Sequence, residues 1–387
     1  MTRKNNLSFD LWFPNIFEFK GGIQVYSAVF LQALQELLPE SNYQVFLKHD
    51  TQYLSDYQFL QKTNYYFAGN SPLSLRTAIF GAKIIGSKLK QRPSLIISGH
   101  VNFSPVAYWL KRLLGIPYWI CVYGVDAWNI KRPALKTALH YADRIISIGS
   151  YTRDRLLTEQ NLAPEKISIL PCTFDVSRFQ IAAKPPHLLK RYGLKPEQPV
   201  ILTVARLDSS DIRSKGYEEI LHALPQIRAS IPNVHYLLVG KGSDRSRIEK
   251  FIAKLNLQDC VTLTGFVPDE ELAQHYNLCD VFAMPSKGEG FGIVFLEALA
   301  CGKPTLGGNQ DGAIDALCHG ELGVLVNPDN QEEIATNLVK ILTENYPNSL
   351  LYQPEKLRQK VLETFGYEQF KQKLATLIDD FVMESLK

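Results

Sequence analysis

The sequence predicts an α/β fold built from two parallel sheets with flanking helices. Short apolar runs of strand length alternate with helical stretches along all 387 residues, which is typical of repeated βαβ units. Two six-stranded, Rossmann-like sheets are expected. Their strands are 7–13, 44–47, 95–97, 118–123, 144–148 and 167–170 in the first half, and 200–205, 235–239, 261–264, 281–284, 304–306 and 324–326 in the second.

The length favours two domains over one. Residues 181–186, Ile-Ala-Ala-Lys-Pro-Pro, have the composition of a linker, so the boundary is expected between about residues 180 and 197. This division predicts an N-terminal domain at 1–182 and a C-terminal domain at 197–364. The remaining segment, 365–387, has helical periodicity in its apolar residues.

The most informative motif runs from Gly288 to Pro304 and combines a glycine loop with an apolar helix, and the segment 279–285 before it is expected to form a short buried strand. Glycines at 288, 290 and 292 allow a ligand to approach the backbone, and the free N–H groups at the helix start favour an anion such as a diphosphate. The motif therefore predicts a nucleotide-sugar site.

Two glutamates lie within this motif. Glu297 is about five residues into the helix, or roughly 7 to 8 Å along it, a distance that suits the ribose of a nucleotide whose diphosphate lies at the helix start. Its neighbours are apolar, and a buried carboxylate without a partner is costly, which favours a binding role over a place on the helix surface. For Glu289 alone, a solvated loop residue is an equally good interpretation.

With Gly290-Phe291-Gly292 between them, Glu289 and Glu297 resemble the paired-glutamate signature of retaining glycosyltransferases of the GT4 type. The resemblance extends over most of the chain, and the order and spacing of its motifs make it specific. These motifs are Gly21-Gly22-Ile23, Ser98-Gly99-His100, Tyr123-Gly124-Val125-Asp126, Ala205-Arg206-Leu207 with Lys215-Gly216, Val239-Gly240-Lys241-Gly242 and Thr264-Gly265-Phe266-Val267.

The resemblance implies the GT-B arrangement, in which two Rossmann-like domains face each other across a cleft and the C-terminal helix packs back on the first domain. It implies the catalytic residues His100, Arg206, Lys215 and Glu289. The implied donor site consists of Gly22, Arg206, Lys215, Lys241, Phe266, Val267, Glu289, Gly290, Phe291, Gly292, Ile293 and Glu297. The implied acceptor side consists of Gly21, Gly22, His100 and Asp126.

The positions of the polar candidates agree with these roles. His100, Asp126 and Arg206 each follow an expected strand, and ligands of open parallel sheets bind outside the carboxyl ends of the strands. Arg206 and Lys215 would supply positive charge to a leaving diphosphate. Surface salt bridges remain the alternative for both cations, Arg213 is an alternative to Lys215, and a structural role remains the alternative for His100.

The expected reaction is transfer of a hexosyl group from a nucleotide diphosphate sugar to an acceptor hydroxyl with retention, in the synthesis of a polysaccharide, glycolipid or other glycoconjugate. A sugar-nucleotide epimerase of the same architecture and a catalytically silent glycosyltransferase-like scaffold are the alternatives. A dehydrogenase is disfavoured, because Arg245 replaces the third glycine of a GxGxxG motif that would begin at Gly240.

No cofactor or metal is expected, because the chain contains no Asp-x-Asp motif. The six cysteines form no CxxC pair and are interpreted as buried free thiols of a reducing compartment. With neither a transmembrane stretch nor a signal peptide evident, a cytoplasmic protein is expected.

Charge is distributed unevenly along the chain. Residues 1–190 carry a net charge of +10 and residues 191–387 a net charge of −7. Basic and aromatic residues are interleaved between 83 and 136, which suits an anionic membrane surface at the inner face of the membrane or a phosphorylated acceptor. Ordinary solvated helix faces are the alternative, and no nucleic-acid partner is expected.

Overall fold

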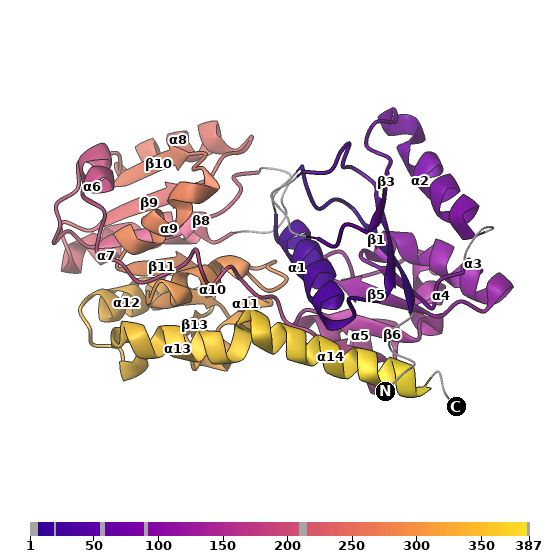
Figure 1. Cartoon of the computed structure of the whole chain (residues 1–387). Coiled ribbons are helices and arrows are strands. Elements are labelled where there is room, and N and C mark those ends of the chain that lie inside the picture. The colour runs from indigo at the N-terminus through magenta and orange to yellow at the C-terminus, as the bar shows by residue number, and fades with distance from the viewer. Residues whose placement is uncertain (1–6, 19–20, 55–58, 89–91, 209–214, 385–387) are drawn as a thin grey trace. The chain divides into compact units, whose positions relative to one another are not determined.

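The computed structural model describes residues 7–18, 21–54, 59–88, 92–208 and 215–384. The chain divides into two compact units (Figure 1). Unit 1 comprises Met1–Thr173 and Glu368–Lys387, and unit 2 comprises Phe174–Tyr367. Each unit contains one parallel sheet, as the sequence predicts.

Unit 1 contains a seven-stranded sheet with the strand order β3-β2-β1-β4-β5-β6-β7. Its central strands are fully buried, as expected when helices cover both faces of a parallel sheet. The strands are β1 (Ser8–Phe13), β2 (Asn42–Leu47), β3 (Asn64–Phe67), β4 (Leu95–Ser98), β5 (Tyr118–Val122), β6 (Arg144–Ser147) and β7 (Ile167–Ile169). The helices are α1 (Gly22–Leu37), α2 (Leu73–Lys88), α3 (Ser104–Leu114), α4 (Pro133–Tyr141), α5 (Ser150–Gln160) and α14 (Tyr367–Glu384), with 3₁₀ turns η2 (Val101–Phe103) and η3 (Pro164–Lys166).

The prediction of six strands in the first sheet is wrong, because it omits β3. This strand has only four residues and lies at the edge of the sheet, where it pairs with β2 alone. Its residues are half-buried or exposed, so they lack the continuous apolar run that marks the central strands. The aromatic triplet Tyr65-Tyr66-Phe67, which has high β propensity, was the available signal.

Unit 2 contains a six-stranded sheet with the order β10-β9-β8-β11-β12-β13, and all six of its expected strands are present. The strands are β8 (Val200–Val204), β9 (His235–Val239), β10 (Val261–Gly265), β11 (Val281–Met284), β12 (Thr305–Gly308) and β13 (Val324–Val326). The helices are α6 (Pro186–Tyr192), α7 (Tyr217–Ser230), α8 (Arg245–Lys254), α9 (Asp269–Leu278), α10 (Ile293–Ala300), α11 (Ala313–Ala316), α12 (Gln331–Leu342) and α13 (Pro354–Phe365), with 3₁₀ turns η4 (Cys318–Gly320) and η5 (Ser349–Tyr352).

The segment expected as a linker belongs to unit 2, and the chain divides at residues 173 and 174 instead. Part of the segment forms α6. The Lys184 ammonium lies 2.6 Å from an Asp280 carboxylate oxygen, and the Asn277 side chain accepts a hydrogen bond from the Ala182 N–H at 2.9 Å. These contacts fix the segment against the sheet of unit 2, whereas a linker would lack such partners.

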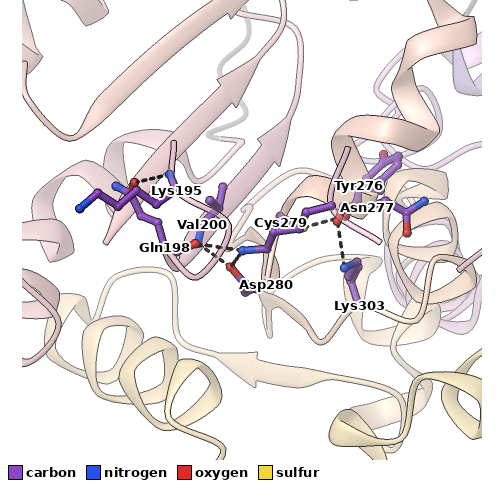
Figure 2. Close-up of polar contacts among 9 residues, drawn as sticks. Lys195, Gln198, Val200, Tyr276, Asn277, Cys279, Asp280 and Lys303 are labelled. Atoms are coloured by element: carbon purple, nitrogen blue, oxygen red, sulfur yellow. Dashed lines mark hydrogen bonds and ion pairs between the residues drawn. The ribbon is translucent and has the colours of Figure 1, made fainter. Parts of the chain in front are cut away.

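Asp280 also joins β8 to β11 at the end of the strands where both begin (Figure 2). Its carboxylate accepts the Val200 N–H at 2.8 Å, and its own N–H donates to the Val200 carbonyl at 2.9 Å. Nearby, the Lys303 ammonium donates to the Asn277 carbonyl at 3.1 Å (Figure 2). The register of the two strands is thereby fixed, and with it the start of the loops that follow them.

The C-terminal helix α14 packs on unit 1. The Phe370 ring lies edge-on to Tyr26 at 5.6 Å, and the Phe381 ring lies edge-on to Trp119 at 5.8 Å. Arg144, at the start of β6, forms ion pairs with Asp380 and Glu384, two carboxylates of this helix. The boundary between unit 2 and α14 falls three residues after the end predicted for the second domain.

Within the described ranges, no helix is both long enough and apolar enough to cross a membrane.

Candidate functional site

In both sheets the first strand of the unit lies between the second and the fourth, so the chain reverses its direction of winding there. In unit 2 the strands on the two sides of this point are β8 and β11. Ligands of doubly wound sheets bind outside the carboxyl ends of such strands. A ligand site is therefore expected at the loops that follow β8 and β11, and these loops contain Lys215 and Glu289.

Lys215 and Glu289 form an ion pair with 2.8 Å between Nζ and Oε2. Their side chains are only 14% and 21% exposed, so this is not the surface salt bridge considered for Lys215. Burial raises the pKa of Glu289, but the Lys215 charge and hydrogen bonds from Lys215, Gly290 and Phe291 outweigh it, and the pKa is lowered overall. The pair thus keeps a carboxylate and an ammonium charged at the edge of the sheet.

Two glycines with positive φ allow these loops to approach each other. Gly216, with φ of 77°, lies so close to Pro285 that an added Cβ would be 2.6 Å from its ring. Gly292, with φ of 92°, precedes α10, and a Cβ there would be 2.5 Å from the Phe295 ring. Any larger residue at either position would displace the loops that carry Lys215 and Glu289.

Asp311 is a site residue that was not identified from the sequence. It is fully buried, and one carboxylate oxygen accepts the Glu289 N–H and the Ser286 hydroxyl, each at 2.7 Å. The other oxygen accepts the Ala313 N–H at 2.9 Å. Burial raises its pKa to about 6. Asp311 thus positions the backbone of the glycine loop, and its place after the strand β12 was the available signal.

Glu297 is half-buried on α10 and accepts a hydrogen bond at 2.7 Å from the hydroxyl of Tyr276, a fully buried residue of α9. Burial raises the pKa of Glu297 to about 7, although the Tyr276 hydrogen bond and the Arg178 charge act in the opposite direction. The carboxylate is therefore held in one orientation with a pKa near neutrality. Tyr276 is a second residue that the sequence patterns did not identify.

The remaining donor candidates lie on the loops after β8, β9 and β10. Arg206 is exposed, and the Lys241 ammonium lies 4.5 Å from the centre of the Phe266 ring. Phe266 is 64% exposed, which is unusual for a large apolar side chain, and Val267 beside it is half-buried. These loops are joined by backbone hydrogen bonds from Gly240 to Gly265 and from Leu207 to Lys241.

The other members of the glycine loop differ in accessibility. Phe291 is buried against Phe365 with ring centres 5.5 Å apart, so its side chain serves packing. Gly290 donates its N–H to the Glu289 carboxylate at 3.2 Å, and Ile293 is the half-buried first residue of α10. Arg213, the alternative to Lys215, lies outside the described residues.

In unit 1 the equivalent strands are β1 and β4, and a hollow of about 430 Å³ lies beyond their carboxyl ends. Gly21 and Gly22, at the start of α1, lie next to Ile23 on its wall. The hollow is lined by Pro14, Asn15, Ile23, Gln24, His49 and His100.

His100 has a structural contact as well as a place on this wall. Its Nδ1 accepts the Asn102 N–H at 3.1 Å and so caps η2. Burial, with the charges of Lys48 and His49, lowers the pKa of His100 to about 4. The ring is therefore neutral near pH 7 with its proton on Nε2, which makes Nε2–H a hydrogen-bond donor.

Asp126, in the loop after β5, is half-buried. One of its carboxylate oxygens accepts the Tyr123 N–H at 2.9 Å, which stabilises the turn around Gly124. Asp126 is not among the residues that line the hollow. In unit 1 the structure therefore brings His100 to the hollow with the start of α1 and gives Asp126 a contact within its own turn.

Comparison with known proteins identifies relatives of both units. Residues 21–178 match the model described as Glycosyltransferase Family 4, and residues 187–361 match that described as Glycosyl transferases group 1. A GDP-mannose-dependent alpha-(1-6)-phosphatidylinositol monomannoside mannosyltransferase of Mycolicibacterium smegmatis is 31% identical over 56% of this chain and 57% of its own length. A 2-deoxystreptamine glucosyltransferase of Streptomyces kanamyceticus is 28% identical over 72% of this chain and 76% of its own length. The chain thus spans little more than half of the mycolicibacterial relative.

Solved structures agree with the fold class. Sucrose-phosphate synthase of Thermosynechococcus elongatus has a TM-score of 0.79 at 21% identity, covering 98% of this chain and 100% of the neighbour. Anabaena HepE in complex with UDP and glucose has a TM-score of 0.76 at 18% identity, covering 97% and 100%. These likenesses confirm the predicted GT-B fold class. With both halves matched by family models and the paired glutamates in their glycine loop, the chain belongs to the GT4-type glycosyltransferases.

Proposed function

We propose that this chain transfers a hexosyl group from a nucleotide diphosphate sugar to an acceptor hydroxyl with retention of the anomeric configuration. The observation that carries the proposal is the half-buried Lys215–Glu289 ion pair at the point where the strand order of unit 2 reverses. It brings a fixed cation, a carboxylate and a glycine loop before a helix to one place, which suits a sugar diphosphate. The names of the two relatives support the same activity.

The donor would be bound by the loops of unit 2. Lys215 and Arg206 would neutralise the diphosphate, and the free N–H groups at the start of α10 would face its oxygens. Glu297, held by Tyr276, would accept hydrogen bonds from the ribose diol, and the exposed Phe266 would lie against the base with Val267. We further propose that no metal ion is needed, since the two cations supply the charge that a metal would otherwise provide.

In the reaction, the bond between the anomeric carbon and the diphosphate breaks while the acceptor oxygen bonds to the same face of that carbon. The acceptor proton passes to an oxygen of the departing diphosphate, so no enzyme nucleophile is needed. Negative charge grows on the diphosphate as it leaves, and preorganised cations stabilise that charge more than the ground state. His100, neutral and donating through Nε2, would orient a hydroxyl of the sugar or acceptor.

Two alternatives carry different expectations. An epimerase of this architecture needs no acceptor, and the two relatives described above are both named as transferases, so we do not retain it. A silent scaffold would have lost the charged groups, yet Lys215, Glu289, Glu297 and Arg206 are all present.

The proposal is tested by incubating the protein with GDP-mannose or UDP-glucose and a panel of acceptors. We expect nucleotide diphosphate release that depends on the acceptor, and NMR of the product should show the anomeric configuration of the donor. An inverted product would exclude the retaining mechanism. Conversion of donor to a second sugar nucleotide, without acceptor, would restore the epimerase.

We also propose peripheral contact with an anionic membrane at the cytoplasmic face, through a patch on α3 and α4. Trp109 and Leu113 are 59% and 74% exposed and lie one turn apart on α3 with exposed Arg112 beside them. The adjacent α4 begins next to exposed Arg132 and carries exposed Lys136. Apolar side chains flanked by cations suit an interface rich in anionic lipid.

Vesicle sedimentation with and without phosphatidylglycerol tests this contact. We expect Arg112→Glu/Lys136→Glu to reduce binding to the anionic vesicles, and Trp109→Ser/Leu113→Ser to reduce it further. Lys250→Glu/Lys254→Glu, which reverses two exposed charges on α8, is the matched control. Lys111 is a poorer target, because its ammonium is already paired with Asp143 at 2.6 Å. Equal recovery in the supernatant for all proteins would remove the membrane from the proposal.

A further inference from the structure

Two histidines line the hollow of unit 1, and two further basic residues, which are not among its lining residues, lie next to them. His49 lies just after β2 and His100 just after β4, and both line the hollow. Lys48 precedes His49 and extends over the Phe103 ring, with Nζ 5.8 Å from its centre. Arg76, on α2, has its Nη1 3.4 Å from Nδ1 of His49. We call Lys48, His49, Arg76 and His100 the basic rim.

The members of the basic rim are close enough to disfavour each other's charge. After burial, the Lys48 and Arg76 charges are the largest causes that lower the pKa of His49, while Asp50 has a smaller opposing effect. The Lys48 and His49 charges act in the same way on His100. Cations that have no ion-paired carboxylate among the described residues raise the free energy of the folded chain, which favours a binding role for them beside the hollow.

No described carboxylate forms an ion pair with Lys48 or Arg76. Arg76 donates instead to the Gly69 carbonyl at 2.7 Å and to the Ser71 carbonyl at 3.2 Å. Asp50, the buried carboxylate that follows His49 in the chain, accepts hydrogen bonds from the backbone instead. Its oxygens accept the N–H groups of Ile16, Phe17 and Glu18 at 2.6, 3.1 and 3.0 Å, which holds residues 16–18 in place.

Among the described residues, the positive charge beside the hollow therefore has no ion-paired carboxylate. We infer that the basic rim binds a phosphate group carried by the acceptor, with the sugar or polyol ring of that acceptor in the hollow beside Asn15 and Gln24. Arg76 and Lys48 would provide charge-assisted hydrogen bonds to the phosphate. The hollow's volume, about 430 Å³, is within the range of small-ligand sites and suits one phosphorylated ring. This inference rests on the proposed function, because it names the class of acceptor.

Calorimetric titration with glucose 6-phosphate, glucose and inorganic phosphate tests the inference on the intact chain. We expect glucose 6-phosphate and inorganic phosphate to bind and glucose to bind far more weakly. Lys48→Gln should weaken phosphate binding by about tenfold or more, the expected cost of one charge-assisted hydrogen bond. Arg76 also supports its own loop, so Arg76→Lys is used beside Arg76→Gln. Lys83→Gln, an exposed lysine of the same helix, is the control.

Parallel titrations with GDP-mannose and UDP-glucose separate the inference from the proposed function. Donor binding that survives in Lys48→Gln, together with loss of phosphate binding, supports both ideas. If phosphate binding is instead lost in Arg206→Ala and kept in Lys48→Gln, the anion site belongs to the donor diphosphate and the inference is wrong. Glucose binding as tightly as glucose 6-phosphate would also overturn it.

The phosphate could be carried by a soluble sugar or by a lipid. Vesicles with phosphatidic acid, a phosphomonoester, are compared with vesicles that contain phosphatidylglycerol, a phosphodiester. Preference for phosphatidic acid that disappears in Lys48→Gln would assign the group to a lipid acceptor. Binding of glucose 6-phosphate without such a preference would assign it to a soluble one. Both results support a phosphate site at the basic rim.

Discussion

The loops at the carboxyl ends of the two sheets, here called the loop edges, differ in how their charged side chains are paired. In unit 2, Lys215 is paired with Glu289, Glu297 accepts from Tyr276, and Asp311 accepts from three donors. In unit 1, the basic rim around the hollow has neighbouring cations and no paired carboxylate among the described residues. Both edges follow the same strand order, so the topology alone does not cause the difference.

The difference indicates what each edge contributes before a ligand arrives. In unit 2, the ion pair of Lys215 with Glu289 and the hydrogen bonds of Asp311 form what we call the closed network. This network holds Lys215 and Glu289 in position, and catalytic electrostatics depend on such preorganisation. A group of cations that lacks paired carboxylates is instead stabilised electrostatically when an anion binds, so it favours negatively charged ligands. We therefore expect substitution of Lys215 to change turnover and stability together, and substitution of Lys48 at the basic rim to change affinity alone.

The largest effect is expected at the closed network. Lys215→Ala should lower turnover on the order of 100-fold, because a fixed positive charge near the leaving diphosphate is lost. It should also lower the free energy of unfolding by about 1–3 kcal/mol, since Glu289 keeps its charge without its partner. Arg206→Ala should lower turnover on the same order without the loss of stability, because Arg206 is exposed. Steady-state kinetics and chemical denaturation measure the two effects.

Lys287→Ala is the control, because Lys287 precedes the same glycine loop but forms its ion pair with the exposed Asp329. We expect it to change neither quantity appreciably. Turnover of Lys215→Ala within twofold of the parent protein would mean that the pair is structural only.

Much of this comparison was accessible from the sequence. The strands other than β3, the glycine loop, and Lys215 and Glu289 as separate candidates follow from periodicity, glycine spacing and resemblance, whereas the ion pair between the two was not predicted. Asp311 and Tyr276 did not, because a single aspartate in a loop and a tyrosine within a helix carry no local signal of the partner they contact. The hydrogen bond of Tyr276 joins it to a residue 21 positions away, and those of Asp311 reach residues 22 and 25 positions away.

The basic rim was hidden for the same reason. Lys48, Arg76 and His100 are far apart in the sequence and come together only because β2 and β4 end beside one hollow and Arg76 of α2 contacts His49. The charge count indicated that the first half is basic, yet it gave equal weight to lysines on solvated faces such as Lys83 and Lys136. Only the arrangement of the strands distinguishes a cluster of basic residues from basic residues that are scattered over the surface.

A smaller effect is expected at Glu297. Glu297→Gln should weaken binding of a nucleotide diphosphate sugar by about 1–3 kcal/mol if the carboxylate accepts hydrogen bonds from the ribose. Since burial raises its pKa to about 7, the ionised form that binds best is lost as pH falls through 7. Affinity of the parent protein should therefore rise between pH 6 and pH 8 and be flat in Glu297→Gln.

Calorimetry with the intact sugar nucleotide measures this, because its diphosphate, unlike that of a free nucleotide, has no terminal phosphate that titrates. Tyr276→Phe removes the donor that stabilises the ionised form and should move the midpoint to higher pH. A parent affinity that does not vary over this range would contradict the role of Glu297.

Substitution of Asp311 tests whether its hydrogen bonds position the glycine loop. Asp311→Asn leaves one of three donors facing an amide N–H₂, which should cost about 1–3 kcal/mol of unfolding free energy near pH 7. The pKa of Asp311 in the folded state, about 6, lies above its usual value of 3.8. The contribution of this group to the free energy of unfolding is therefore fully present below pH 3.8 and is lost as pH rises through about 6. Denaturation at several pH values should show that this decline between pH 4 and 6 is absent in Asp311→Asn. A decline of equal size in both proteins would assign it to other groups.

The smallest effect is expected from giving the hollow of unit 1 a carboxylate of its own. Gln24 lines the hollow and donates to Asn15 at 2.7 Å, so Gln24→Glu would bring a negative charge to the basic rim. The pKa of His100 should rise from about 4, because an opposite charge nearby favours the protonated ring. Stability near pH 7 should increase by no more than about 1 kcal/mol, while phosphate binding should weaken as the new carboxylate repels the anion. NMR titration of the histidine rings measures the first effect, with Gln32→Glu as the control, since this exposed residue lies about 12 Å further along α1. An unchanged His100 titration together with unchanged phosphate affinity would mean that the rim's charges do not act on the hollow, and the contrast between the two loop edges would then have no consequence for binding.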